Sequence, residues 1–536
     1  MNQETKGDGY CGELMELTLF HYVVGAIALI MLIWNTVEVG RNDAANIVNA
    51  VFGARVMTRS KAVWIAGIAV IIGALASSPV METARKGIFD PESLPGINAA
   101  ISVYIGVYLT NTVLLYSFSA YGMPVSTTAC LVFALLGAGF AMGGPDAIHW
   151  DKSSKVILGI ICSIIVSGIA GFLVQRMFRG VVRDDCEDPQ TIKLHGPWMA
   201  GALLTGLVYF LVMKGMKNVA LVKMIKANTF DTLGAPFALL IIWAVLSVLT
   251  FVVIHFWGRS VSSRLFAGLA VLGMIATAVA FGQNDLANCA SPGLAIMMIL
   301  QKGELAGSVD VHWFWLFCCG VLLFMGMTTK TAQRVTRAEV NTGSQGDLVR
   351  LYAPQWCIAV ARWIVPKAGQ DQALAPKPKA TQQDKLQHYD ALRAAVITSV
   401  TGSVIAFASG MGLPVSTTYV AFAAVISTGW ADKIFARGDA ALKMGRTIWV
   451  VFCWFFSAFI AAFVAGLVSK VISLGGLFGI AVGLIGNLAV RFIMRKRADK
   501  HEAHLKEQAI IRKQQLQQSS GGADLKFASD EDGDQF

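Results

Sequence analysis

Long apolar runs alternate with short polar segments over most of the chain. A helix needs about 20 apolar residues to cross the hydrocarbon core of a bilayer, and many of these runs come close to that length. They include 62–80, 99–118, 155–174, 197–212, 236–256, 265–281, 314–327, 391–411, 448–471 and 477–493. The pattern predicts an all-α polytopic membrane protein.

Two polar stretches interrupt this apolar pattern and repeat each other. Residues 40–46 read GRNDAAN, and residues 282–288 read GQNDLAN. A carboxylate and two carboxamides within a hydrophobic segment are costly unless they face a ligand, an ion path or each other. Apolar halves around a polar, glycine-marked centre also predict a discontinuous helix at each stretch. The alternative is a buried structural acid that caps a helix break.

A second repeated pair follows in the same order. Residues 122–128 read GMPVSTT, and residues 412–418 read GLPVSTT. Serine and threonine hydroxyls beside the free N–H groups of a helix start can cradle an anion. The alternative is local N-capping, in which the hydroxyls bond to their own backbone. The apolar runs around each motif are short for separate spans and predict the arms of a re-entrant hairpin.

Both motifs therefore occur twice, which indicates an internal duplication. Two half-proteins of this kind resemble the inverted-repeat plan of secondary transporters, whose site lies where the repeats meet. The expected segments are an N-terminal segment 1–20, a first membrane repeat 21–175, a polar connection 176–196, membrane spans 197–327, a polar cytoplasmic loop 328–390, a C-terminal membrane region 391–494 and a basic, then acidic tail 495–536.

Composition narrows the class of protein further. The 536 residues are 55% hydrophobic and only 15% charged, with a mean hydropathy of +0.59, which excludes a soluble globule. The net charge of +10 first suggests basic cytoplasmic loops and second an anionic substrate, with nucleic acid well below both. No cluster of His, Asp and Glu and no phosphate-binding loop supports an enzyme or a cofactor. A receptor or sensor is disfavoured because the long loop has linker composition.

The chemistry of the motifs suits a small oxyanion that travels with cations. Neutral hydroxyl donors can replace the water of an oxyanion without binding it too tightly. Carboxylate and carboxamide oxygens are hard ligands for an ion such as sodium, and a carboxylate can instead carry a proton. A carboxylate can also accept the proton of hydrogen phosphate, which sulfate lacks at neutral pH. Phosphate and sulfate both remain open at this point.

The four motifs together resemble the signatures of the inorganic phosphate transporter (Pit) family over about residues 21–494. The resemblance implies a sodium- or proton-driven phosphate symporter with about 12 membrane helical elements in two inverted repeats, often a homodimer, in the plasma (inner) membrane. It implies substrate binding by Ser126, Thr127, Thr128, Ser416, Thr417, Thr418, Asn42, Asn284, Asp43 and Asp285. It implies cation binding by Asp43, Asn46, Asp285 and Asn288, with sodium at Asp43 and Asp285.

The chain departs from the family pattern at several positions. Arg41 and Gln283 stand where a small residue is usual, and Ala129 and Tyr419 replace the histidine that follows Ser-Thr-Thr. Arg41 either adds a charge to the anion path or pairs with Glu38 one turn back. Sulfate-carrying relatives exist in the same family, so sulfate is the alternative substrate.

Overall fold

The computed structural model describes residues 19–77, 80, 87–182, 188–215, 220–302, 311–346, 349–365, 388–436 and 439–519. Every regular element within these ranges is a helix, apart from an isolated bridge between Phe89 and Ile148. Eight of the described helices are long and apolar enough to cross a membrane, or up to nine if a bent pair forms one span. The prediction of an all-α polytopic membrane protein is confirmed.

The helices that build and surround the polar motifs come from the whole length of the chain. They are α1 (Leu19–Gly53), α2 (Arg59–Ala74), α4 (Ile97–Ala120), α5 (Thr127–Gly143), α6 (Trp150–Val182), α7 (Pro189–Leu207), α8 (Ala220–Ile225), α9 (Asp231–Leu233), α10 (Ala235–Ser262), α11 (Leu265–Lys302), α12 (Trp313–Met327), α13 (Lys330–Thr342), α14 (Gln355–Ile364), α16 (Ala391–Gly410), α17 (Thr417–Ala431) and α18 (Ala440–Ser519). Short 3₁₀ or π turns lie at Pro91–Ser93, Pro145–Ala147, Val208–Gly215, Lys226–Phe230 and Ile434–Ala436.

Helices α1 and α11 run without interruption through the two Asn-Asp motifs. They are 35 and 38 residues long and carry the motifs in their interiors, so the prediction of a discontinuous helix there is wrong. The glycine that begins each motif serves close packing instead. A methyl group on Gly40 would lie 2.0 Å from the carbonyl oxygen of Leu323 in α12, and one on Gly282 would lie 2.1 Å from that of Val70 in α2. Only glycine permits backbones to approach this closely.

Each Ser-Thr-Thr motif lies at the turn of a helical hairpin. The first turn joins α4 to α5, and the second joins α16 to α17. Gly122 (φ +62°) and Gly412 (φ +72°) adopt the left-handed conformation that reverses the chain. With 17 and 15 residues, α5 and α17 are shorter than a bilayer span. Helices this short, α2 (16 residues) among them, are not counted as spans, and the whole of α18 is counted as one. The spans therefore number fewer than the 12 or so expected elements. The re-entrant character of the hairpins and the inverted relation of the halves stay predictions.

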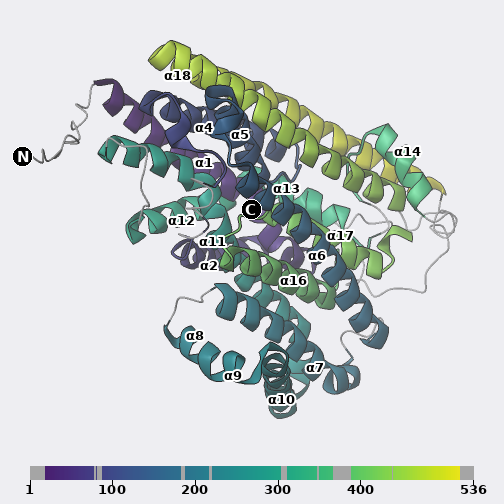
Figure 1. Ribbon diagram of the computed structural model, residues 1–536. Coiled ribbons are helices and arrows are strands. Elements are labelled where there is room, and N and C mark those ends of the chain that lie inside the picture. Colours follow the sequence, from purple (N-terminus) through teal and green to yellow (C-terminus); the bar gives the residue numbers. More distant parts are fainter. Residues whose placement is uncertain are drawn as a thin grey trace, which may run out of the picture.

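Helix α18 forms a long hairpin of its own along one side of the molecule (Figure 1). The chain reverses at Gly476, where φ is +52°. Both arms pack against α4. Ser469 of the first arm contacts Gly106, and Asn487 of the second arm donates to the carbonyl of Leu109 at 2.9 Å. Figure 1 shows α7 to α10 at the opposite end of the molecule. The motif helices α1 and α11 therefore lie between these two groups.

Large apolar side chains cover the outer faces of several helices. Examples are Leu173 in α6, Phe251 in α10 and Phe463 in α18, all exposed in the isolated chain. Such extended apolar surface is typical of helices that face lipid. It agrees with an integral, multi-pass membrane protein.

The polar segment 328–390 is more helical than its composition suggests. Helix α13 packs against α1, and the amphipathic α14 packs against α18. The linker-like stretch 373–385 lies outside the described residues, as do the N-terminal residues 1–18 and the acidic end of the tail. The segment boundaries expected from the sequence stay predictions.

Candidate functional site

The two Asn-Asp motifs contact the two hairpin turns in matching ways. Asn42 in α1 donates from Nδ2 to the carbonyl of Val125, at 2.6 Å. Asn284 in α11 donates to the carbonyl of Val415 at 2.8 Å and accepts from the N–H of Val415 at 3.1 Å. Each carboxamide therefore holds the residue that precedes a Ser-Thr-Thr run. Equivalent residues of the two halves make equivalent contacts.

Hydroxyl groups reach from each hairpin to the carboxylate of the other half. Thr418 donates from Oγ1 to Asp43 Oδ1, at 2.9 Å. Thr127 donates from Oγ1 to Asp285 Oδ1, also at 2.9 Å. The two carboxylates interact electrostatically with each other, and Thr417 lies beside Asp285. Residues 375 positions apart in the sequence thus meet in one centre.

The last asparagine of each motif completes this centre. Asn46 donates from Nδ2 to Asp43 Oδ1 at 2.9 Å and to Thr418 Oγ1 at 3.1 Å. Asn288 donates to Asp285 Oδ1 and to Thr128 Oγ1, both at 2.7 Å. The spacing of three residues places each carboxylate and carboxamide on one face of a helix. All of these side chains are buried.

The electrostatics of the centre favour a cation. Asp43 and Asp285 are both 0% exposed, and within the described part of the chain no Lys, Arg or His forms an ion pair with either. Asp43 Oδ2, Asn46 Oδ1 and Asn288 Oδ1 are buried and accept no hydrogen bond. Two buried anions with no positive partner are costly. Their free oxygens are the hard ligands that a small cation uses.

The two serines of the motifs cap the helices that follow them. Ser126 Oγ accepts from the N–H of Ala129 at 2.9 Å, and Ser416 Oγ accepts from the N–H of Tyr419 at 3.1 Å. Local N-capping is thus one role of these hydroxyls, and ligand binding is the other role expected from the motifs. A capping serine still has its hydroxyl proton, which can be donated to an anion. The proposed contact of these residues with substrate stays a prediction.

Arg41 takes part in a charged network beside the centre. Its guanidinium bonds both carboxylate oxygens of Glu38, at 2.9 and 2.8 Å. Arg491 in α18 also bonds Glu38, at 2.5 Å, and lies over the rings of Trp34 and Tyr116. Of the two roles expected for Arg41, the structure therefore supports pairing with Glu38.

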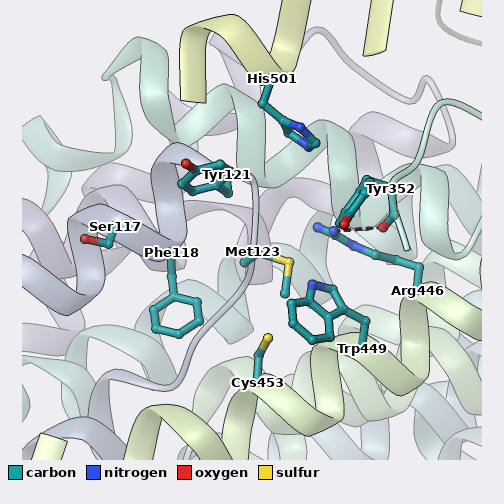
Figure 2. A pocket seen from close by; sticks show the side chains of 9 residues that line it. All are labelled: Ser117, Phe118, Tyr121, Met123, Tyr352, Arg446, Trp449, Cys453 and His501. Atoms are coloured by element: carbon teal, nitrogen blue, oxygen red, sulfur yellow. Dashed lines mark hydrogen bonds between the residues drawn. The ribbon is translucent and has the colours of Figure 1, made fainter. Parts of the chain in front are cut away.

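A cavity of about 390 Å³ lies beside the turn that leads to Ser126 (Figure 2). Arg446 on its wall is buried and donates to the carbonyls of Gly122 at 2.8 Å and Tyr352 at 3.1 Å. Figure 2 shows aromatic rings, including Trp449, around this space. None of the predicted site residues lines it, so the cavity is separate from the carboxylate centre. In the sequence, the only sign of this cavity is the single arginine, Arg446, just before an apolar run.

Other contacts of the motif helices were not foreseen. Ser119 donates to Asn42 Oδ1 at 3.1 Å. Asn49 donates from Nδ2 to Glu339 Oε1 in α13 at 2.8 Å. Asn49 could have been found because it lies on the same face of α1 as Asn42 and Asn46. Nothing in the sequence pairs it with Glu339, which is 290 residues away.

Comparison with known proteins decides the family. The model of the "Phosphate transporter family" matches residues 39–338 and 379–465, which is well over half of the chain and includes all four motifs. This chain belongs to the phosphate transporter family. The resemblance drawn from the motifs is therefore confirmed, and the family is one of transporters rather than of enzymes.

Similar proteins occur in archaea and plants. A Pyrococcus furiosus protein named "Putative phosphate permease" is 27% identical over 441 residues, which cover 78% of this chain and 88% of the relative. The Arabidopsis thaliana protein "Inorganic phosphate transporter 2-1, chloroplastic" is 23% identical over 467 residues, covering 79% and 70%. The solved structure "The sodium-dependent phosphate transporter" has a TM-score of 0.60 at 20% identity, covering 84% of this chain and all of that one. The chain shares its fold.

These findings confirm a multi-pass membrane protein of a transporter family. The plasma (inner) membrane as its location stays a prediction.

Proposed function

We propose that this protein carries inorganic phosphate across a membrane by symport with sodium or protons. The observation that carries the proposal is the buried centre in which both halves supply a carboxylate, carboxamides and hydroxyls, with each half bonded to the other. Membership in the phosphate transporter family and the names of the relatives support phosphate as the substrate.

The phosphate is assigned to the two Ser-Thr-Thr runs. Ser126 and Ser416 stand at the N-caps of α5 and α17, where free N–H groups and the helix dipole attract an anion. Neutral donors allow the anion to leave as well as to enter. The nearby carboxylates offer an acceptor for the proton of hydrogen phosphate, which favours phosphate over sulfate.

The coupling cations are assigned to Asp43 with Asn46 and to Asp285 with Asn288. Sodium fits the free oxygens of this centre, because Asp43 Oδ2, Asn46 Oδ1 and Asn288 Oδ1 are acceptors without donors. A solved relative of the same fold is titled a sodium-dependent phosphate transporter. Sodium is thus the first ion to test and the proton the second. Neither role needs a bound cofactor.

The deciding experiment is uptake of radiolabelled phosphate into proteoliposomes that hold the purified protein. Uptake is measured with a sodium gradient, then with a proton gradient, and with excess unlabelled sulfate as competitor. The same measurement is repeated with labelled sulfate in place of phosphate. We expect cation-dependent uptake that sulfate does not suppress. Accumulation of labelled sulfate instead of phosphate would retain the site and change the substrate, whereas no uptake of either anion would contradict the transport function.

Isosteric variants connect this uptake to the site. Asp43→Asn and Asp285→Asn keep the shape of the side chains and remove one charge each, so we expect coupled uptake to fall to background while the protein still reaches the membrane. Asp146→Asn is the matched control, because Asp146 is exposed and lies in the 3₁₀ turn that follows α5. Wild-type uptake by Asp43→Asn would remove this carboxylate from the mechanism.

The homodimer and the lipid contacts are carried forward as predictions. The exposed apolar faces of α6 and α10 offer surface for either. The mass of the purified complex in detergent distinguishes one copy from two.

A further inference from the structure

A second buried acid, Glu339, lies in α13 and is not part of the carboxylate centre. Its side chain is 1% exposed, and Oε1 accepts one hydrogen bond, from Asn49 Nδ2 at 2.8 Å. Its other oxygen, Oε2, is buried without a hydrogen-bond partner. In the described ranges no basic side chain forms an ion pair with it. A buried carboxylate with a single neutral donor lacks a partner for its charge.

Asn49 connects this acid to the central site. Residues 42, 46 and 49 follow a spacing of four and three, which places them along one face of α1. Two oxygens on this face, Asn46 Oδ1 and Asn49 Oδ1, are buried and accept no hydrogen bond, and neither does Asp43 Oδ2 beside them. Asn42 Oδ1, by contrast, accepts from Ser119. Glu339 Oε2 extends this series from α1 to α13. A row of unsatisfied oxygens inside a protein is what a dehydrated cation requires.

We propose that Glu339 and Asn49 form a further sodium site, next to the central site along α1. This inference rests on the proposed cation-coupled function and names where an additional cation is held. The donors are a carboxylate and a carboxamide, with no nitrogen or sulfur ligand, which suits sodium rather than a transition metal. Half a turn of the Asn49 carboxamide exchanges its nitrogen for its oxygen. The oxygens of Asn49 and Glu339 then both face the ion.

Direct binding of ²²Na⁺ to the purified full-length protein, without phosphate, tests this site independently of transport. Glu339→Gln is isosteric and can still accept the hydrogen bond from Asn49, so its fold is retained. We expect this variant to bind sodium at least about tenfold more weakly at one site, because the loss of one charged ligand reduces affinity by about that factor. Asn49→Ala is the second variant and is expected to weaken the same site. Glu502→Gln is the matched control, because Glu502 pairs with Arg334 at 2.6 Å.

Uptake measurements distinguish this site from the central one. In Glu339→Gln we expect the half-saturating sodium concentration for phosphate uptake to rise at least about tenfold, with the phosphate KM at saturating sodium unchanged. Wild-type ²²Na⁺ binding and sodium dependence in both variants would overturn the site while leaving the transport function intact. If the wild-type protein carries no phosphate but the variants still lose ²²Na⁺ binding, the sodium site is supported and the proposed function is overturned.

Discussion

Replacing Gly40 by alanine tests how the Asn-Asp motif is positioned. The added methyl group would lie 2.0 Å from the carbonyl oxygen of Leu323, whereas real Cβ atoms essentially never come within 3.0 Å of another atom. Both partners are helical backbone, so α1 and α12 must separate by at least about 1 Å. Overpacking of this kind costs about 1–3 kcal/mol. Removing a glycine from a helix interior offsets about 0.5–1 kcal/mol of this cost.

The effect on transport is expected to exceed the effect on stability. Asn42 and Asp43 lie two and three residues from Gly40, so a shift of α1 displaces them from the hairpin turns. A misplacement of 1 Å in a reacting group can reduce rates on the order of 10²-fold. We expect Gly40→Ala to fold with a lowered melting temperature and to lose phosphate uptake on that scale.

The matched control is Gly168→Ala in α6. Apart from the neighbouring backbone of α6 itself, no atom lies within 4 Å of a methyl group at that position. This variant therefore gains about 0.5–1 kcal/mol of stability from the glycine replacement alone. Melting temperature in detergent and the initial rate of phosphate uptake are measured for both variants. If Gly40→Ala is as stable and as active as Gly168→Ala, close approach of α1 and α12 does not position the site.

Three further predictions concern other parts of the molecule. Ser416→Ala removes the cap of α17 and should lower the free energy of unfolding by about 1 kcal/mol, measured by melting temperature, whereas Ser416→Thr should restore it. Glu38→Gln leaves Arg41 and Arg491 facing each other without an anion, so we expect the free energy of unfolding to fall by about 3–5 kcal/mol. An unchanged melting temperature would contradict this. Burial, with Arg55 and Lys443 nearby, lowers the pKa of His388 to about 4. As the pH falls, His388 therefore binds a proton in the unfolded chain before it does so in the folded chain. The free energy of unfolding should fall by about 3 kcal/mol from pH 6.5 to pH 4, and His388→Gln should flatten this dependence.

The sequence could predict the parts of the site that occur twice. The Asn-Asp and Ser-Thr-Thr motifs are each polar within apolar surroundings, and such groups must meet one another or a ligand. Their actual contacts, such as Thr418 with Asp43, follow once two halves are assumed to pack face to face. The all-helical membrane fold follows from the lengths of the apolar runs alone.

The remaining features depend on neighbours that are distant in sequence. From the sequence, Gly40 and Gly282 are equally consistent with a helix break and with close helix packing. Which of the two occurs depends on the helices that lie opposite them. The sequence allows two roles for Arg41, and its pairing with Glu38 depends also on Arg491, which bonds the same carboxylate from α18. Glu339 lay in a polar stretch, where one acid among several charged residues gives no signal of burial.

The exchange of hydroxyls across the centre has a consequence for the origin of the protein. Asp43 receives its threonine from the second half, and Asp285 receives its threonine from the first. A chain of half this length would therefore carry a carboxylate without its partner. An ancestor from before the duplication could complete this centre only by pairing with a second copy of itself, and fusion of the two genes would then have made that association permanent.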